Sequence, residues 1–183
     1  MNYEKQSWIS ALDLLQTKVQ EVPMLWGNFL PMTGIAGLTG SSDCGKSTLL
    51  RQLAIAIAAG DSEFLGSPLN VRYGHAYYVS TEDEQVNIAA CLSKQMGEDY
   101  NDDVKRRLLF RTDSADLIEN LDTAFANRPA DLVVLDCWAD TFTGNPNNLV
   151  EVRKDMSRLK AIIKKYECLI IILHHTVKNS ENQ

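Results

Sequence analysis

Residues 34–59 read GIAGLTGSSDCGKSTLLRQLAIAIAA, and this stretch decides the fold class. Its short apolar opening, from Gly34 to Thr39, is typical of a buried strand and runs directly into a glycine-containing loop. From Ser47 to Ala59 the apolar side chains recur at helical spacing, and Gly60 is a natural stop signal for a helix. The sequence therefore predicts a strand, a tight loop and a helix in immediate succession.

The rest of the chain alternates between strand and helix patterns. Further strands are predicted at His75–Ser80, Leu108–Arg111, Leu132–Leu135 and Cys168–Leu173. Helices are predicted between the second strand and about Met96, at Asp116–Asn127, and at Val150–Tyr166, the last with Met156, Leu159, Ile162 and Ile163 facing inward. This alternation predicts an α/β fold whose mainly parallel sheet carries helices on both faces.

The N-terminal part of the chain has a different pattern. Residues 8–15 carry apolar side chains at helical spacing, with Ser10 placed as the N-cap of a short helix. Residues 24–30 lie between two prolines and are better suited to an extended or turn-rich linker. We therefore expect residues 1–30 to form a helix and linker, and residues 31–183 to form one α/β domain.

The loop after the first strand has the residues of a phosphate-binding loop. The pattern GxxxxGK[ST] is matched in full by Gly40, Ser41, Ser42, Asp43, Cys44, Gly45, Lys46 and Ser47, and Thr48 follows. The glycines let backbone N–H groups turn toward phosphates, and the helix dipole adds to that attraction. Lys46 is expected to reach the β- and γ-phosphates, Ser47 to coordinate Mg²⁺, and Thr48 to bond an α-phosphate oxygen. The sequence thus predicts a site for ATP and Mg²⁺.

A second magnesium ligand is expected at the end of the strand Leu132–Leu135. Asp136 closes this apolar run, as in a Walker B strand, and its carboxylate would hold the magnesium shell opposite Ser47. A strand-end aspartate can also simply begin a turn. The phosphate loop upstream favours the functional interpretation.

An acidic cluster follows the predicted strand His75–Ser80. Glu82 is our candidate for the general base that activates the water attacking the γ-phosphate, with Asp83 as the substitute. An alternative is structural, because Thr81 and Glu84 have the spacing of a capping box for the next helix. Both roles are compatible with this sequence.

Two histidines leave the last predicted strand side by side. Because side chains alternate along a strand, only one of His174 and His175 can face a bound nucleotide. That histidine is a candidate sensor of the γ-phosphate, and a purely structural role for both is the alternative. The residues alone do not choose between the two.

Composition limits the partners and the compartment. The 183-residue chain is 45% hydrophobic and 23% charged, as a globular protein is, and its net charge of −6 disfavours a surface that coats nucleic acid throughout. No apolar run is long enough to span a membrane, and the first residues lack the pattern of a secretory signal, so we expect a cytoplasmic protein. The four cysteines show no CxxC pair and no metal-ligand spacing.

Several motifs occur in the order found in one known family. They are SALDLL (10–15), LP (30–31), GSSDCGKST (40–48), FLG (64–66), YYVSTEDE (77–84), DLVVLDC (131–137) and LHHTVK (173–178). On these motifs the chain resembles the RecA-like AAA-type ATPases related to plasmid RepA hexameric replicative helicases. The resemblance implies a RecA-type core, ATP hydrolysis with Glu82 as base, His174 or His175 as γ-phosphate sensor, and a homo-oligomeric ring or filament acting on single-stranded DNA.

The resemblance leaves open questions at the C-terminus and over the activity. Relatives usually continue beyond the histidine motif, so a fragment or a degenerate member is an alternative, and an arginine finger has no assignable position. A nucleotide-binding adaptor or loader with little turnover is the main rival function. A small-molecule kinase would want an arginine-rich lid, whereas the arginines here are scattered. A GTPase is disfavoured because neither DxxG after Asp136 nor NKxD occurs.

Overall fold

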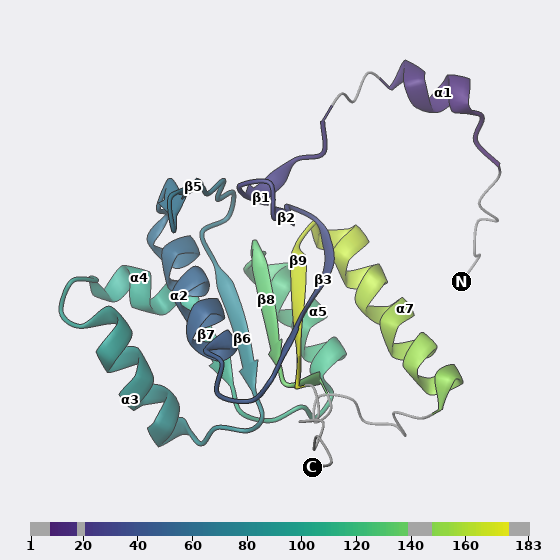
Figure 1. The fold of residues 1–183 in the computed structure, drawn as a ribbon. Helices are drawn as coiled ribbons and strands as arrows, with labels where there is room; N and C mark the ends of the chain where they lie inside the picture. Colours follow the sequence, from purple (N-terminus) through teal and green to yellow (C-terminus); the bar gives the residue numbers. More distant parts are fainter. Residues whose placement is uncertain (1–7, 18–20, 139–147, 176–183) are drawn as a thin grey trace, which may run out of the picture.

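The computed structural model describes residues 8–17, 21–138 and 148–175. These residues build a five-stranded sheet in the order β3-β9-β8-β6-β7, in which every neighbouring pair is parallel (Figure 1). Its strands are β3 (Gly34–Gly40), β6 (Ala76–Ser80), β7 (Leu108–Arg111), β8 (Leu132–Asp136) and β9 (Leu169–His175). The predicted α/β fold with a mainly parallel sheet is confirmed.

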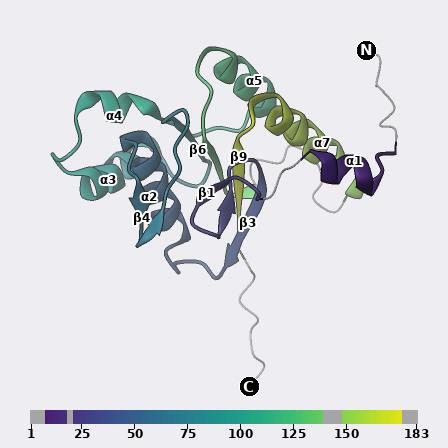
Figure 2. The ribbon, with the colours of Figure 1, turned by 90° about the horizontal axis from the view of Figure 1, so that it is seen from above.

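Helices cover both faces of the sheet, because parallel neighbours need crossover connections that return over a face. Seen from above, the two sets of helices lie on opposite sides of the strands (Figure 2). One set is α2 (Lys46–Ala59), α3 (Gln85–Met96) and α4 (Asp102–Arg107), and the other is α5 (Leu117–Asn127) and α7 (Leu149–Tyr166). Each face therefore has its own apolar core.

Alternation along the strands divides the buried side chains between these cores. Leu132 and Val134 of β8 pack in the core beneath α2, whereas Val133 and Leu135 pack beneath α5 and α7. The sheet is apolar on both faces, and β8 is buried along its whole length. This explains why β8 reads as a continuous apolar run rather than as an alternating one.

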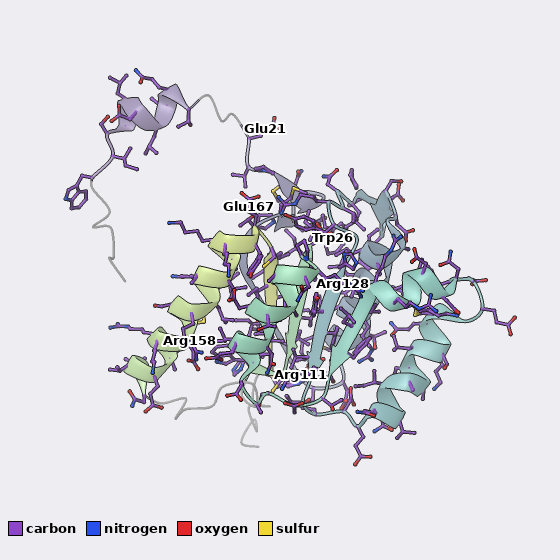
Figure 3. All side chains as sticks on the ribbon, turned by 180° about the vertical axis from the view of Figure 1, so that it is seen from behind. Glu21, Trp26, Arg111, Arg128, Arg158 and Glu167 are labelled. Carbon is purple, nitrogen blue, oxygen red and sulfur yellow. The ribbon has the colours of Figure 1, made fainter. Side chains whose placement is uncertain are left out.

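The helices α5 and α7 also contact each other along the side shown in Figure 3. Arg158 of α7 forms an ion pair with Glu119 of α5. In the last turn of α7, Lys165 Nζ lies 2.7 Å from Asp122 Oδ1. Exposed pairs of this kind contribute at most about 1 kcal/mol each, so the apolar contacts beneath them stabilise this layer.

Short elements lie before β3 and between α2 and β6. The predicted N-terminal helix is α1 (Ala11–Gln16), and the Ser10 hydroxyl accepts a hydrogen bond from the Asp13 N–H at 3.1 Å. The predicted linker contains two antiparallel strands, β1 (Met24–Trp26) and β2 (Leu30–Pro31). A second antiparallel pair, β4 (Glu63–Phe64) and β5 (Ser67–Pro68), follows α2. Leu25 of β1 is buried in the core beneath α2.

The predicted capping box at Thr81 and Glu84 is wrong. The N-cap of α3 is Glu84, and its side chain makes no capping hydrogen bond. Thr81 instead turns toward β8, where its backbone N–H donates to the Asp136 carbonyl at 2.9 Å. Pairing with the neighbouring strand keeps Thr81 out of the first turn of α3.

None of the described helices is both long and apolar enough to cross a bilayer.

Candidate functional site

The carboxyl ends of β6, β8 and β9 carry three polar side chains on the same face as α2. Side chains alternate along a strand, so Ser80 and Asp136 follow the even-numbered positions of β6 and β8 that pack beneath α2. On β9 the odd-numbered positions pack beneath α2, and His175 follows these. Register supports this, because Ser80 lies opposite Asp136 on β8, and Gly40 lies opposite His175 on β9. In open parallel sheets, ligands bind at this edge.

The loop between β3 and α2 has a backbone that depends on its glycines. Gly45 is the N-cap of α2 with a φ of 86°, in the left-handed region that disfavours other residues. At Gly40 a Cβ atom would lie only 3.2 Å from the Cys44 sulfur. Residues 41–45 are exposed, so the loop between these glycines is accessible at the start of the helix.

Lys46, the first residue of α2, is buried against the loop, with 7% of its surface exposed. Its ammonium group donates to the carbonyls of Ser41 at 2.7 Å and Gly40 at 3.1 Å, and it lies 3.3 Å from His175 Nδ1. Because a buried charge needs polar partners, these contacts explain how the loop tolerates Lys46. The same ammonium could exchange carbonyls for a bound anion.

Tyr78 connects the predicted magnesium ligands. Its hydroxyl donates to Asp136 Oδ2 at 2.7 Å and lies 3.4 Å from the backbone carbonyl of Ser47. Burial, together with the negative charge of Asp136, raises the pKa of Tyr78 well above its ordinary value of 10.0. Tyr78 is therefore a neutral hydroxyl that holds the buried Asp136 carboxylate beside the first turn of α2.

The two acidic candidates have different partners. Asp83 accepts a hydrogen bond from the Ser80 hydroxyl at 3.3 Å, and its Oδ2 lies 3.7 Å from an Arg51 guanidinium nitrogen. Glu82 instead extends toward β9, where its Oε2 lies 3.3 Å from His175 Nε2. Nearly half of the Glu82 side chain, 48%, is exposed. The geometry favours Glu82 over Asp83 for contact with a ligand.

The two histidines lie on opposite faces of the sheet. His175 contacts both Lys46 and Glu82, and its Nε2 atom is buried without a hydrogen-bond partner among the described residues. His174 is exposed, and its even-numbered position along β9, like those of Ile170 and Ile172, directs it to the face of α5 and α7. Of the two alternatives left open by the sequence, the structure brings only His175 to the loop.

A cavity of about 620 Å³ lies where these groups meet. This volume is within the usual range for small-molecule sites. Its lining includes Ser42, Asp43, Gly45, Lys46, Ser47, Thr48, Glu82, Asp136 and His175. Of the remaining predicted residues, Gly40, Ser41 and Cys44 belong to the same loop without lining the cavity, whereas His174 lies on the other face of the sheet.

The residues that could hold a magnesium ion fit its preferences. Mg²⁺ selects hard oxygen ligands and is usually bound by one or two carboxylates together with phosphate oxygens. The Ser47 hydroxyl and the Asp136 carboxylate are of this kind, and both line the cavity. Lys46 and the N-terminus of α2 supply the positive charge that a triphosphate needs.

Sequence reasoning missed two residues that support this site. The sequence pattern indicates only a strand position for Tyr78 and only a helix position for Arg51. Arg51 is 6% exposed, and its Nε donates to Gln95 Oε1 at 3.2 Å. An arginine among the apolar residues of a buried helix was the available signal, because a fully buried arginine needs partners.

Comparison with known proteins gives one family match. A family model described as AAA domain matches residues 4–181, which is nearly the whole chain. None of the curated proteins compared with this chain matches it.

Proposed function

Because the chain belongs to the AAA domain family, we propose that it binds ATP with Mg²⁺ and hydrolyses the bond between the β- and γ-phosphates. One observation carries the proposal. His175 lies between the phosphate-loop lysine and the acidic residue after β6, with 3.3 Å from Nδ1 to Lys46 Nζ and 3.3 Å from Nε2 to Glu82 Oε2. His175, at the end of β9, thus contacts both the candidate phosphate-binding lysine and the candidate general base.

Residues 40–48 hold the triphosphate in this proposal. Lys46 exchanges its carbonyl contacts with Gly40 and Ser41 for the β- and γ-phosphate oxygens. Ser47 and Asp136 hold Mg²⁺, which when bound neutralises charge on the phosphates. Tyr78 positions Asp136 through the hydrogen bond at 2.7 Å.

Glu82 acts as the general base in this proposal. It orients the attacking water and takes its proton, a role worth about a hundredfold to ten-thousandfold in rate. His175 senses the γ-phosphate, since its contact with Lys46 depends on where the ammonium lies. Asp83 holds the loop after β6 through Arg51 and Ser80.

The resemblance to RepA-related helicases extends the proposal to partners. We propose that the protein acts in the cytoplasm as a homo-oligomeric ring or filament on single-stranded DNA, in replication or repair. The net charge of −6 then requires that basic residues of several subunits gather locally. A nucleotide-binding adaptor or loader with little turnover remains the second candidate, ahead of a small-molecule kinase.

Steady-state phosphate release from ATP tests these functions. Hydrolysis that is stimulated by single-stranded DNA and abolished in Lys46→Ala supports the proposal. Tight nucleotide binding without turnover supports the adaptor, and phosphate transfer to an added metabolite supports the kinase. Normal turnover in Lys46→Ala would refute the site itself.

A further inference from the structure

Three side chains of unlike chemistry meet at the edge of the sheet beside the cavity, which two of them, Glu82 and His175, line. Glu82, Cys137 and His175 each bring one potential ligand atom within 4.8 Å of the other two. They come from the loop after β6, the residue after β8 and the last residue of β9. Because they are far apart in the chain, no short motif in the sequence indicates the cluster.

The donor atoms favour zinc over magnesium. A thiolate, an imidazole nitrogen and a carboxylate oxygen are ligands that Zn²⁺ accepts together, whereas Mg²⁺ prefers oxygen alone. Zinc with bonds of about 2.0–2.3 Å in a tetrahedron separates its ligand atoms by about 3.3–3.8 Å. The 3.3 Å between His175 Nε2 and Glu82 Oε2 already fits this spacing. The sulfur of Cys137 lies within 4.8 Å of a ligand atom of each of these two residues.

The state of His175 points to the same place. Its Nε2 atom is buried and, although it lies 3.3 Å from Glu82 Oε2, it makes no hydrogen bond to Glu82 or to any other described residue, which is unusual for a buried polar atom. If the metal binds Nε2, the neutral ring carries its proton on Nδ1. This N–H would face the Lys46 ammonium 3.3 Å away, and because both groups are donors they could not bond to each other. Lys46 would then retain its bonds to the carbonyls of Gly40 and Ser41.

We propose that Glu82, Cys137 and His175 form a zinc site with one open position, and that zinc bound there stops ATP hydrolysis. The regulatory half rests on the proposed function, since it requires that Glu82 and His175 act on the nucleotide. Zinc occupies both side chains at once, so neither is available to a γ-phosphate or to the attacking water. The ligands differ from Ser47 and Asp136, the pair proposed for Mg²⁺.

Metal binding is tested on the full chain without nucleotide or magnesium. Co²⁺ is the probe, because a thiolate bound to Co²⁺ gives a charge-transfer absorption, and added Zn²⁺ should displace it. We expect one equivalent to bind. Cys137→Ser should lose the absorption. His175→Asn should weaken metal binding about tenfold or more, because even mutation of residues that only orient the ligands lowers metal affinity by that much.

Matched controls are available next to the ligands and elsewhere in the chain. His174→Asn and Cys91→Ser should keep both the absorption and the affinity. Retention of the absorption in Cys137→Ser, or its loss in Cys91→Ser, would overturn the site. A circular dichroism spectrum for each variant separates lost ligation from lost folding.

The regulatory half is tested by phosphate release with Mg²⁺ and ATP in excess. Zinc should inhibit the wild type at the concentrations that displace cobalt. For Cys137→Ser, the zinc concentration that halves the rate should rise at least about tenfold. Cobalt absorption with zinc-insensitive turnover would overturn the regulation. An absence of turnover under all conditions would instead refute the proposed function, while the cobalt experiment still decides the metal site.

Discussion

Among single residues, the neighbours Glu82 and Asp83 differ most clearly in their contacts. Glu82 meets His175, whereas Asp83 is paired with Arg51 and Ser80. We expect Glu82→Gln to bind ATP normally but to hydrolyse it about a hundredfold to ten-thousandfold more slowly, because the amide cannot accept the proton from water. Single-turnover phosphate release, with nucleotide affinity measured separately, checks this.

Asp83→Asn is the matched control for this prediction. We expect Asp83→Asn mainly to weaken the contact with Arg51. Nucleotide affinity or stability should therefore change more than the turnover rate. If Asp83→Asn abolishes hydrolysis while Glu82→Gln leaves it unchanged, the base is Asp83 and the assignment is reversed.

Tyr78 gives the site a dependence on alkaline pH. Burial raises its pKa in the folded protein above the ordinary value of 10.0, so the unfolded chain loses this proton first as pH rises. The stability that the neutral hydroxyl contributes is therefore fully present below about pH 10 and is lost above it. Tyr78→Phe should be less stable by about 1–3 kcal/mol near neutral pH, because Asp136 loses a buried donor.

Urea unfolding of both proteins from about pH 7 to about pH 11 tests this. The stability difference between wild type and Tyr78→Phe should shrink as pH rises above about 10. Tyr77→Phe is the control, since the Tyr77 hydroxyl bonds the Arg128 carbonyl at an exposed position, and we expect a smaller change. A constant difference for Tyr78→Phe would contradict the linkage.

Much of the candidate site could be predicted from residue types, but its contacts could not. The loop, Asp136 and the acidic residues after β6 lie at strand ends, and the apolar runs indicate those ends. Alternation along β9 shows that His174 and His175 face opposite ways. It does not show which of the two faces α2, because that depends on how β9 sits in the folded sheet. Cys137 lacked a sequence signal, because its cluster forms only through the order of the strands.

At the level of elements, Asp131 links the segment before β6 to the start of β8. This carboxylate is 2% exposed and accepts three backbone N–H bonds, from Arg72 at 3.0 Å, Tyr73 at 2.9 Å and Gly74 at 2.8 Å. Asp131→Asn replaces one acceptor oxygen by a donor amide that faces the same N–H groups. We expect a loss of about 1–3 kcal/mol in the free energy of unfolding.

Chemical denaturation measures this loss as a lower midpoint at an unchanged slope. The exposed Asp99→Asn is the control and should change stability by about 0.5 kcal/mol or less. Equal stability of Asp131→Asn and wild type would mean that the segment before β6 is held by its other contacts.

The larger elements were predictable because each carries a strong local signal, whereas the small ones depend on contacts. The periodicity of α7 and the apolar run of β8 locate both elements closely. By contrast, β1 and β2 are stabilised by pairing with each other and by Leu25 in the core. The predicted cap at Thr81 was wrong because hydrogen bonding to β8 overrode a local pattern.

At the scale of the whole molecule, the cavity joins the first turn of α2 to the ends of three central strands. A ligand that binds only the folded state should therefore stabilise the entire domain against global unfolding. At a hundred times its dissociation constant, ATP with Mg²⁺ contributes about 2.7 kcal/mol. For a domain of this size, that corresponds to a rise in melting temperature of about 5–11 °C. Differential scanning fluorimetry measures the rise. Lys46→Ala should lose it, and Glu82→Gln should retain it, because only the first change removes charge that holds the phosphates. An equal shift in Lys46→Ala would place the nucleotide elsewhere on the protein.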